Sequence, residues 1–408
     1  MIKVLALVVD EHKIIKPLER LDFLGIEYLV VNSNTTLSEP FPDLIVTVSD
    51  WRHDIARLLY DAKKRNIPTL LLQDGTLDWI LQFEGDKYGG KGGPTHYHPI
   101  LTDKIACIGA ASARVISSFS GVESVEVTGF PKMYDEILDA GKYNSLKRQS
   151  ENESKKRTIL ITSPRQGWFS DTQKSALIQA LIDLKVFTDN RKDIKCIWRL
   201  SRNLASLIGV ENSMKEKESF ELVELIKESD IVISAQSTVV LEAMLYNKPV
   251  AIIDYLNSPQ FYNTAWFINH RDQISKCIND MLKVPPQKML FQEFQLRDNL
   301  SLDSDPIEQC GQLIDSMVRY KKSTNSTIFP TNMLRFNSPF PKIKTGNNLP
   351  LFYPNVLAFK YNDVSRLQFL YNRLLHERKS GKSIVAQIKR VFSKLSNSLF
   401  GNKNINLY

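Results

Sequence analysis

The chain has 408 residues, of which 43% are hydrophobic and 24% are charged, values typical of a globular protein with a sizeable core. At about 150 residues per domain, this length predicts two or three domains. No window approaches the roughly 18 consecutive apolar residues of a membrane span. The four cysteines lie far apart and without the spacing of metal ligands, so we expect free thiols, no bound metal and a cytoplasmic protein.

The formal net charge of +8 is concentrated near the C-terminal end of the sequence. Between Lys360 and Tyr408, ten Lys and Arg side chains stand against Asp363 and Glu377, so this segment carries the whole excess. The rest of the chain is balanced. A basic tail on a neutral body argues against a broad nucleic-acid-binding surface, and we expect no nucleic-acid partner.

The first part of the chain alternates short β-branched runs with stretches of helical spacing. Such alternation predicts a parallel sheet covered by helices. The expected strands are Lys3–Val9, Tyr28–Val31, Leu44–Val48, Thr69–Leu72, Lys104–Ile108 and Val125–Val127, and the expected helices include Trp51–Arg65 and Ala110–Phe119. We assign residues 1–144 to this Rossmann-like domain and the polar stretch 145–157 to a linker.

The alternation restarts after the linker and predicts a second doubly wound α/β domain over residues 158–320. Its expected strands are Thr158–Thr162, Ile194–Trp198, Ile231–Ser234 and Val250–Ile253, and its expected helices are Asp171–Leu184, Phe220–Ser229, Thr238–Tyr246, Arg271–Leu282 and Pro306–Tyr320. Residues 321–408 begin as a loop and end in helical stretches, of which Ser383–Phe400 has one apolar stripe beside basic residues. We expect residues 380–408 either to contact an anionic membrane surface or to form a helix that packs back on the first domain.

Three small polar residues, Gln236, Ser237 and Thr238, stand where an expected strand passes into a helix. In open α/β sheets, ligands bind at the carboxyl ends of the strands, where N–H groups at the start of a helix suit phosphate oxygens. Glu242 lies on the same helical face as Thr238, about 6 Å further along, which is roughly the step from a diphosphate to a ribose. The alternative is a simple helix cap at Ser237 and an exposed glutamate at position 242.

The sequence from Ser229 to Ile252, SDIVISAQSTVVLEAMLYNKPVAI, resembles the nucleotide-binding segment of the GT-B glycosyltransferase superfamily. That superfamily includes UDP-N-acetylglucosamine 2-epimerases and bacterial surface-polysaccharide glycosyltransferases. Two further segments are similar, VTGFP at 127–131 with Asp135, and LLQDG at 71–75. The resemblance covers most of residues 1–320 and implies two Rossmann-like domains, a diphosphate bound at residues 236–238 and a ribose bound by Glu242.

Two turns of the second domain depart from the family pattern. The stretch TSPRQGW at 162–168 keeps Arg165 but lacks the His, Glu and Asn of the epimerases, which disfavours epimerisation. In WRLSRN at 198–203, Ser201 stands where the transferases have a histidine. The resemblance implies that Arg165 binds phosphate, and Arg199 either does the same or forms an ion pair in the core.

Sugar transfer requires a group that accepts the proton of the acceptor hydroxyl. Asp74 follows an expected strand, and a glycine-rich loop at 89–99 contains His96 and His98, so these three residues are the candidates. Their alternative interpretations are a turn aspartate and a surface histidine pair. Asp303 and Asp305 imitate a metal-binding Asp-x-Asp motif, but Pro306 follows, which favours a helix N-cap. His270 either contacts the donor base or begins a helix.

Together these observations predict a metal-independent glycosyltransferase without a bound cofactor. Its donor would be a nucleotide sugar of the UDP or CMP type, and its acceptor a growing surface polysaccharide or a lipid-linked glycan. It would be cytoplasmic or peripheral on the inner face of the cell membrane. The alternatives are a glycerol- or polyol-phosphate transferase, a nucleotide-sugar epimerase, and a non-catalytic binding subunit with the same fold.

Overall fold

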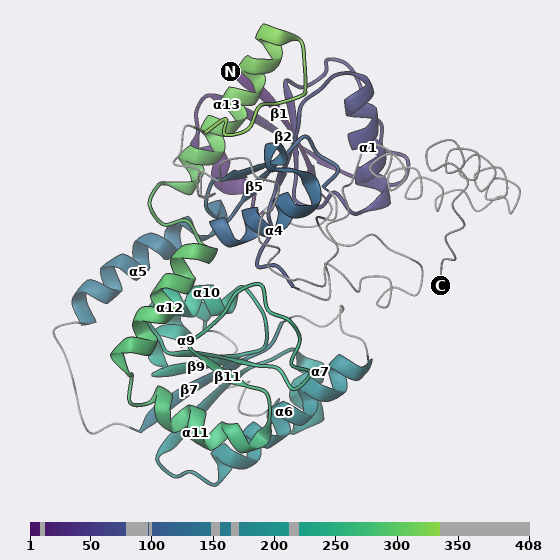
Figure 1. Cartoon of the computed structure of the whole chain (residues 1–408). Coiled ribbons are helices and arrows are strands. Elements are labelled where there is room, and N and C mark those ends of the chain that lie inside the picture. Colours follow the sequence, from purple (N-terminus) through teal and green to yellow (C-terminus); the bar gives the residue numbers. More distant parts are fainter. Residues whose placement is uncertain are drawn as a thin grey trace, which may run out of the picture. The chain divides into compact units, whose positions relative to one another are not determined.

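The computed structural model describes residues 1–8, 13–78, 97, 100–147, 156–164, 171–211 and 220–334 (Figure 1). All of these residues belong to one compact unit, Met1–Tyr361. The described residues end at Leu334, so the helical stretches predicted beyond residue 360 lie outside the described part. No helix in that part is both long and apolar enough to cross a membrane.

The first sheet has six parallel strands in the order β2-β1-β3-β4-β5-β6. They are β1 (Ile2–Val8), β2 (Leu24–Val30), β3 (Leu44–Thr47), β4 (Thr69–Leu72), β5 (Lys104–Cys107) and β6 (Val125–Val127). Every residue of β3, β4 and β5 is buried, as expected for strands covered by helices on both faces. The helices α1 (His53–Lys64) and α4 (Ala110–Ser120) are amphipathic and provide part of this cover.

The second sheet is also parallel and has the order β11-β10-β9-β7-β8. Its strands are β7 (Arg157–Thr162), β8 (Ile194–Arg199), β9 (Ile231–Ser234), β10 (Val250–Ile253) and β11 (Trp266–Ile268). The helices between them are α6 (Asp171–Asp189), α7 (Arg202–Ile208), α9 (Leu222–Glu228) and α10 (Val239–Leu245), and α11 (Arg271–Met281) follows. Since β8 lies on one side of β7 and β9 on the other, the winding reverses between β7 and β9, where doubly wound sheets bind ligands.

Two helices pack against the sheet of the other half of the chain. Helix α5 (Tyr134–Lys147) contacts α10, and its Ala140 lies in the same apolar cluster as Val240 and Met244. Helix α13 (Pro306–Thr324) places Leu313 and other apolar side chains in the core of the first sheet. Two doubly wound sheets with interleaved helices confirm the predicted fold class.

The sequence did not predict three elements of the second half, α7, β11 and α12 (Pro286–Asn299). Helix α12 exposes Leu290, Phe291 and Phe294, and only Gln292, Leu296 and Asn299 are buried, so its apolar residues do not mark its buried face. Strand β11 has three residues, too few to show a period. Helix α5 continues to Lys147, into the first residues of the predicted linker, and α13 continues into the predicted loop.

A buried ion pair fixes the segment that follows α13. Lys104, at the start of β5, lies 2.6 Å from a carboxylate oxygen of Glu126 in β6, and its Nζ also donates to the carbonyl of Pro330 at 2.7 Å. The Glu126 carboxylate accepts a hydrogen bond from the backbone N–H of Met333 at 2.9 Å. A buried pair with several additional hydrogen bonds holds one defined geometry, so residues 330–334 are held against the first sheet.

Candidate functional site

Three polar side-chain atoms at the carboxyl ends of neighbouring strands are buried and make no hydrogen bond with the described residues. They are Ser163 Oγ after β7, Ser201 Oγ after β8 and Gln236 Nε2 after β9. Leaving a buried polar group unpaired costs about 1–3 kcal/mol, so native structures rarely contain three of them together. They lie where the sheet reverses its winding, which is where doubly wound sheets bind ligands, so they are candidates for contact with one.

The turn after β9 adds backbone donors to this set. The N–H groups of Gln236, Ser237 and Thr238 form no hydrogen bond within the described residues. The turn is fixed by Ser234, whose Oγ accepts from Thr162 Oγ1 at 2.7 Å, donates to the carbonyl of Ala235, and lies 3.2 Å from Ser237 Oγ. A rigid loop that presents several free N–H groups suits an anion.

The helix-cap interpretation of Ser237 is wrong. The N-cap of α10 is Thr238, whose side chain makes no capping hydrogen bond, and the helix begins at Val239, one residue later than predicted. The polar side chains of this turn are therefore not explained by the requirements of the helix.

Glu242 lies in the first turn of α10 and is partly buried, which contradicts the alternative of an exposed glutamate. Burial raises the pKa of its carboxyl group, and the nearby positive charges of Lys132 and Arg199 oppose that effect. The carboxylate forms no hydrogen bond or ion pair with the described residues. It is thus an acceptor next to a group of donors.

Arg199 ends β8, and its Nη1 donates to the carbonyl of Phe220 at 3.0 Å. It forms no ion pair within the described residues, so the predicted alternative of a core ion pair is not found there. Its positive charge acts on Glu242, which places it near the same edge of the sheet. The other predicted residues Arg165, His96 and His98 lie outside the described residues.

The turn after β4 in the first sheet contacts the turn after β9. Gly75 lies so close to Thr238 that a Cβ atom on the glycine would be 2.9 Å from Thr238 Oγ1. The preceding residue, Asp74, is exposed at the carboxyl end of β4, as predicted. A predicted proton acceptor is thereby adjacent to the predicted diphosphate-binding turn.

Tyr262, which the sequence interpretation missed, joins the same two turns. It lies between β10 and β11, is 1% exposed, and donates from its hydroxyl group to the carbonyl of Ser237 at 3.4 Å. The side chain of Thr76 is a second hydrogen-bond partner, and burial raises the pKa of the phenol. Its position after the predicted strand Val250–Ile253 was the available signal, since residues that follow strands of such sheets line the ligand edge.

Comparison with known proteins shows which fold this is. No family model and no curated protein match the sequence. Among solved structures, the UDP-GlcNAc 2-epimerase from Neisseria meningitidis bound to UDP-GlcNAc is 13% identical, with a TM-score of 0.52 over 78% of this chain and 100% of that one. A putative UDP-N-acetylglucosamine 2-epimerase from Listeria monocytogenes is 11% identical, with a TM-score of 0.51 over 79% and 97% of the two chains. The chain has a GT-B fold. The resemblance inferred from the sequence is confirmed at the level of the fold.

Two sequence features of this GT-B fold have structural roles. Asp305 accepts hydrogen bonds from the N–H groups of Ile307 and Glu308 at 2.8 and 3.2 Å, so the N-cap interpretation is confirmed. No group of three His, Cys, Asp or Glu residues in the described part has the arrangement of a metal site. His270 is the N-cap of α11 and accepts from the N–H of Asp272, which confirms that it begins a helix.

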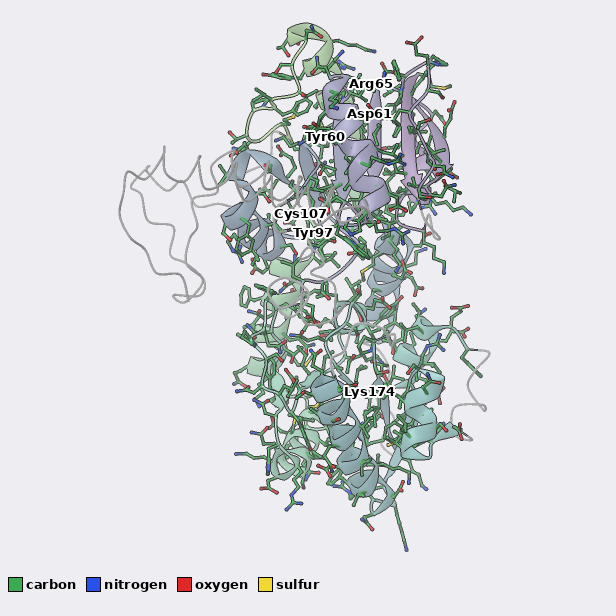
Figure 2. All side chains as sticks on the ribbon, turned by 90° about the vertical axis from the view of Figure 1, so that its right-hand side faces the viewer. Tyr60, Asp61, Arg65, Tyr97, Cys107 and Lys174 are labelled. Atoms are coloured by element: carbon green, nitrogen blue, oxygen red, sulfur yellow. The ribbon has the colours of Figure 1, made fainter. Side chains whose placement is uncertain are left out.

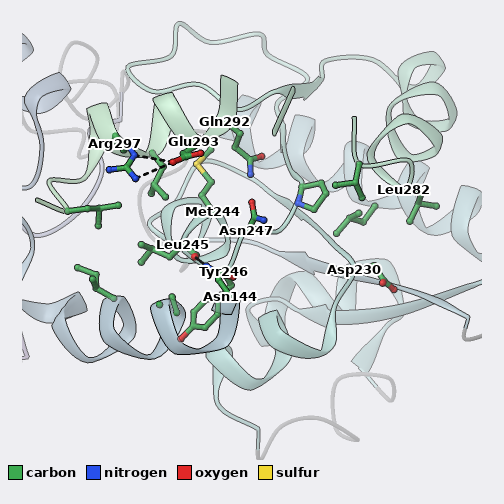
Figure 3. A pocket seen from close by; sticks show the side chains of 18 of the residues that line it. Asn144, Asp230, Met244, Leu245, Tyr246, Asn247, Leu282, Gln292, Glu293 and Arg297 are labelled. Carbon is green, nitrogen blue, oxygen red and sulfur yellow. Dashed lines mark hydrogen bonds and ion pairs between the residues drawn. The ribbon is translucent and has the colours of Figure 1, made fainter. Parts of the chain in front are cut away.

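The GT-B fold also has a groove at the opposite, amino-terminal edge of the second sheet (Figure 3). Residues of α5, the end of α10 and α12 line it, and their polar groups bond to the protein itself. Asn144 donates to the carbonyl of Leu245 at 2.8 Å, and Arg297 pairs with Glu293 at 3.1 Å. Because these groups are satisfied, the groove is not the candidate ligand site.

Proposed function

We propose that this protein is a metal-independent glycosyltransferase that moves a sugar from a nucleotide-sugar donor to a surface polysaccharide or a lipid-linked glycan. The observation that supports this proposal is a set of donors, at the point where the second sheet reverses its winding, that have no partner among the described residues. These are the Ser163 and Ser201 hydroxyls, the Gln236 amide, and three backbone N–H groups of the turn after β9.

The chemistry of these groups fits a nucleoside diphosphate. Phosphate oxygens accept hydrogen bonds, so a site made of N–H and O–H donors suits them, and Arg199 adds a positive charge. Glu242 has the opposite character, because an ionised carboxylate only accepts and therefore suits the hydroxyl pair of a ribose. Donors followed by an acceptor about one helical turn away match the order of diphosphate and ribose in a nucleotide.

The proposed reaction uses these groups and the first domain. The acceptor oxygen forms a bond to the anomeric carbon of the donor sugar. The bond from that carbon to the phosphate oxygen breaks, and its electron pair leaves with the nucleoside diphosphate. Asp74 accepts the proton of the acceptor hydroxyl, and the donors at the sheet edge stabilise the charge on the leaving diphosphate. His96 and His98 remain candidates for contact with the acceptor.

The basic tail at residues 380–408 supports an acceptor at an anionic membrane surface. Each Lys or Arg near such a surface contributes on the order of 1 kcal/mol of attraction, so a cluster gives lasting contact. We therefore place the enzyme in the cytoplasm, against the inner face of the cell membrane.

The experiment that tests the donor site is the thermal unfolding of the protein with UDP, CDP, CMP, GDP and their sugar conjugates. A ligand at about 100 times its dissociation constant stabilises the folded state by about 2.7 kcal/mol. In domains of this size, that corresponds to an increase in Tm of roughly 5–10 °C. An increase with one nucleotide class identifies the base. No increase with any of them at millimolar concentration refutes the proposal.

A further inference from the structure

The segment Gln73-Asp74-Gly75 is held by more contacts than a turn requires. The buried Gln73 side chain donates to the carbonyl of Gly75 at 2.6 Å and to Ser112 Oγ at 2.9 Å, and its Oε1 accepts from the N–H of Ile108. A side chain that bonds in three directions fixes the backbone on both sides of Asp74.

Among the described residues, the hydrogen bonds to Asp74 come from Tyr97, which is 23 positions away in the sequence. The phenol of Tyr97 donates to Asp74 Oδ1 at 2.6 Å, and its oxygen accepts from the backbone N–H of Asp74 at 3.2 Å. Tyr97 thus fixes both the main chain and one carboxylate oxygen of Asp74. The second oxygen, Oδ2, has no hydrogen-bond partner within the described ranges.

Tyr97 is a rigid support. Its side chain is 3% exposed and packs in an apolar cluster with Leu71, Leu77 and Cys107. Figure 2 labels Tyr97 and Cys107. The Tyr97 backbone φ of 55° lies in the left-handed region, which is unfavourable for a bulky residue. Such conformations persist where the surrounding structure enforces them, and they concentrate at functional sites.

Burial and the adjacent Asp74 charge raise the pKa of the Tyr97 phenol. The hydroxyl therefore stays protonated near neutral pH and remains a donor to the carboxylate. This hydrogen bond occupies Oδ1 and leaves Oδ2 as the oxygen that faces no partner among the described residues.

We propose that Tyr97 is the positioning residue that holds the Asp74 carboxylate beside the turn at Thr238, with one oxygen bound and the other available to the acceptor hydroxyl. This inference rests on the proposed function, because it assumes that Asp74 accepts the proton. Tyr97 does not touch the reacting atoms. It acts through Asp74, whose neighbour Gly75 contacts Thr238.

The test compares Tyr97→Phe with Tyr28→Phe. Both substitutions keep the ring and remove a phenol that donates to a carboxylate at 2.6 Å, and Tyr28 lies on the edge strand β2, three strands from β4. Three quantities are measured: hydrogen exchange of the peptide containing Asp74, the dissociation constants of the nucleotides named above, and the release of nucleotide from UDP-N-acetylglucosamine, GDP-mannose, CMP-N-acetylneuraminic acid and CDP-glycerol.

We expect Tyr97→Phe to exchange the Asp74 amide about 3- to 10-fold faster and to lower kcat by about 10- to 100-fold, with KM within twofold of the wild-type value. Tyr28→Phe should change none of these. Unchanged exchange or unchanged kcat in Tyr97→Phe overturns the inference and leaves the donor site intact. Wild-type protein that binds no nucleotide refutes the proposed function. If it binds a nucleotide but water does not replace the acceptor hydroxyl and no nucleotide is released, the exchange of the Asp74 amide in Tyr97→Phe alone decides the inference.

Discussion

Replacing Glu242 by glutamine tests the donor site most directly, because it removes one negative charge and keeps the shape of the side chain. The carboxylate has no partner among the described residues, so the substitution breaks no contact that holds the fold. Hydrogen bonds to a charged group contribute about 1.5–3 kcal/mol. Their loss should weaken nucleotide binding by about 10- to 150-fold.

The pH dependence of binding gives a second signature. Burial raises the pKa of Glu242, so the carboxyl is protonated at a higher pH than an ordinary glutamate, for which the value is about 4.3. Nucleotide affinity should therefore fall as the pH is lowered through that raised value, and Glu242→Gln should lack this fall. The contribution of Glu242 to folding stability changes in the opposite direction, because it becomes more favourable as the pH is lowered. The folded state binds the Glu242 proton more tightly than the unfolded state, so the ionised carboxylate destabilises the fold. In the absence of nucleotide, Glu242→Gln should therefore be at least as stable as the wild type at neutral pH.

Isothermal titration calorimetry across pH 4.5–8 measures both effects, and Glu293→Gln is the matched control. Glu293 is exposed on α12 and pairs with Arg297 at the amino-terminal edge of the sheet, so its loss should leave nucleotide affinity unchanged. The reasoning is refuted if Glu242→Gln binds as tightly as the wild type, or if it keeps the same loss of affinity at low pH.

Three further predictions follow from the same geometry. Ser201→Ala removes a buried hydroxyl that has no partner in the described part of the chain, so the ligand-free protein should lose no stability in urea unfolding, while nucleotide affinity falls about 3- to 10-fold; a loss of stability would instead show a structural role. Gly75→Ala should weaken nucleotide binding, because its Cβ would lie 2.9 Å from Thr238 Oγ1, and Thr238→Ala in the same chain should restore part of that loss; simple additivity of the two changes would contradict the contact. Deleting residues 380–408 should reduce sedimentation with vesicles that contain phosphatidylserine at low salt, and unchanged sedimentation would exclude this segment as the membrane contact.

The central strands were predicted well because they are short apolar runs that are buried on both faces, whereas the half-buried β2 (Leu24–Val30) was predicted only as Tyr28–Val31. The bounds of β9 and β10 were predicted without error, since polar or turn residues such as Asp230 and Pro249 interrupt the apolar runs. Helix α12 was not predicted, because it packs through Gln292 and Leu296 and exposes two phenylalanines. The positions of its apolar residues therefore do not match its buried face.

The candidate site was predicted where its residues are adjacent in sequence and missed where they are not. Gln236 to Glu242 form one continuous motif. The sequence shows Ser201 only as the absence of a histidine, because the lack of a hydrogen-bond partner among the described residues is visible only in three dimensions. The bond between Tyr97 and Asp74 joins positions 23 residues apart, and no local pattern indicates it.

The ion pair of Lys104 and Glu126 determines how the protein can be attached to a surface. Lys104 begins β5 and binds the carbonyl of Pro330, whereas Asp74 follows the carboxyl end of the neighbouring strand β4. The chain therefore passes the amino-terminal edge of the first sheet shortly before Leu334. A biotin acceptor or a fluorescent label inserted after Leu334 would start from that edge, on the side away from Asp74, so immobilisation there should leave access to the carboxyl edge of this sheet open.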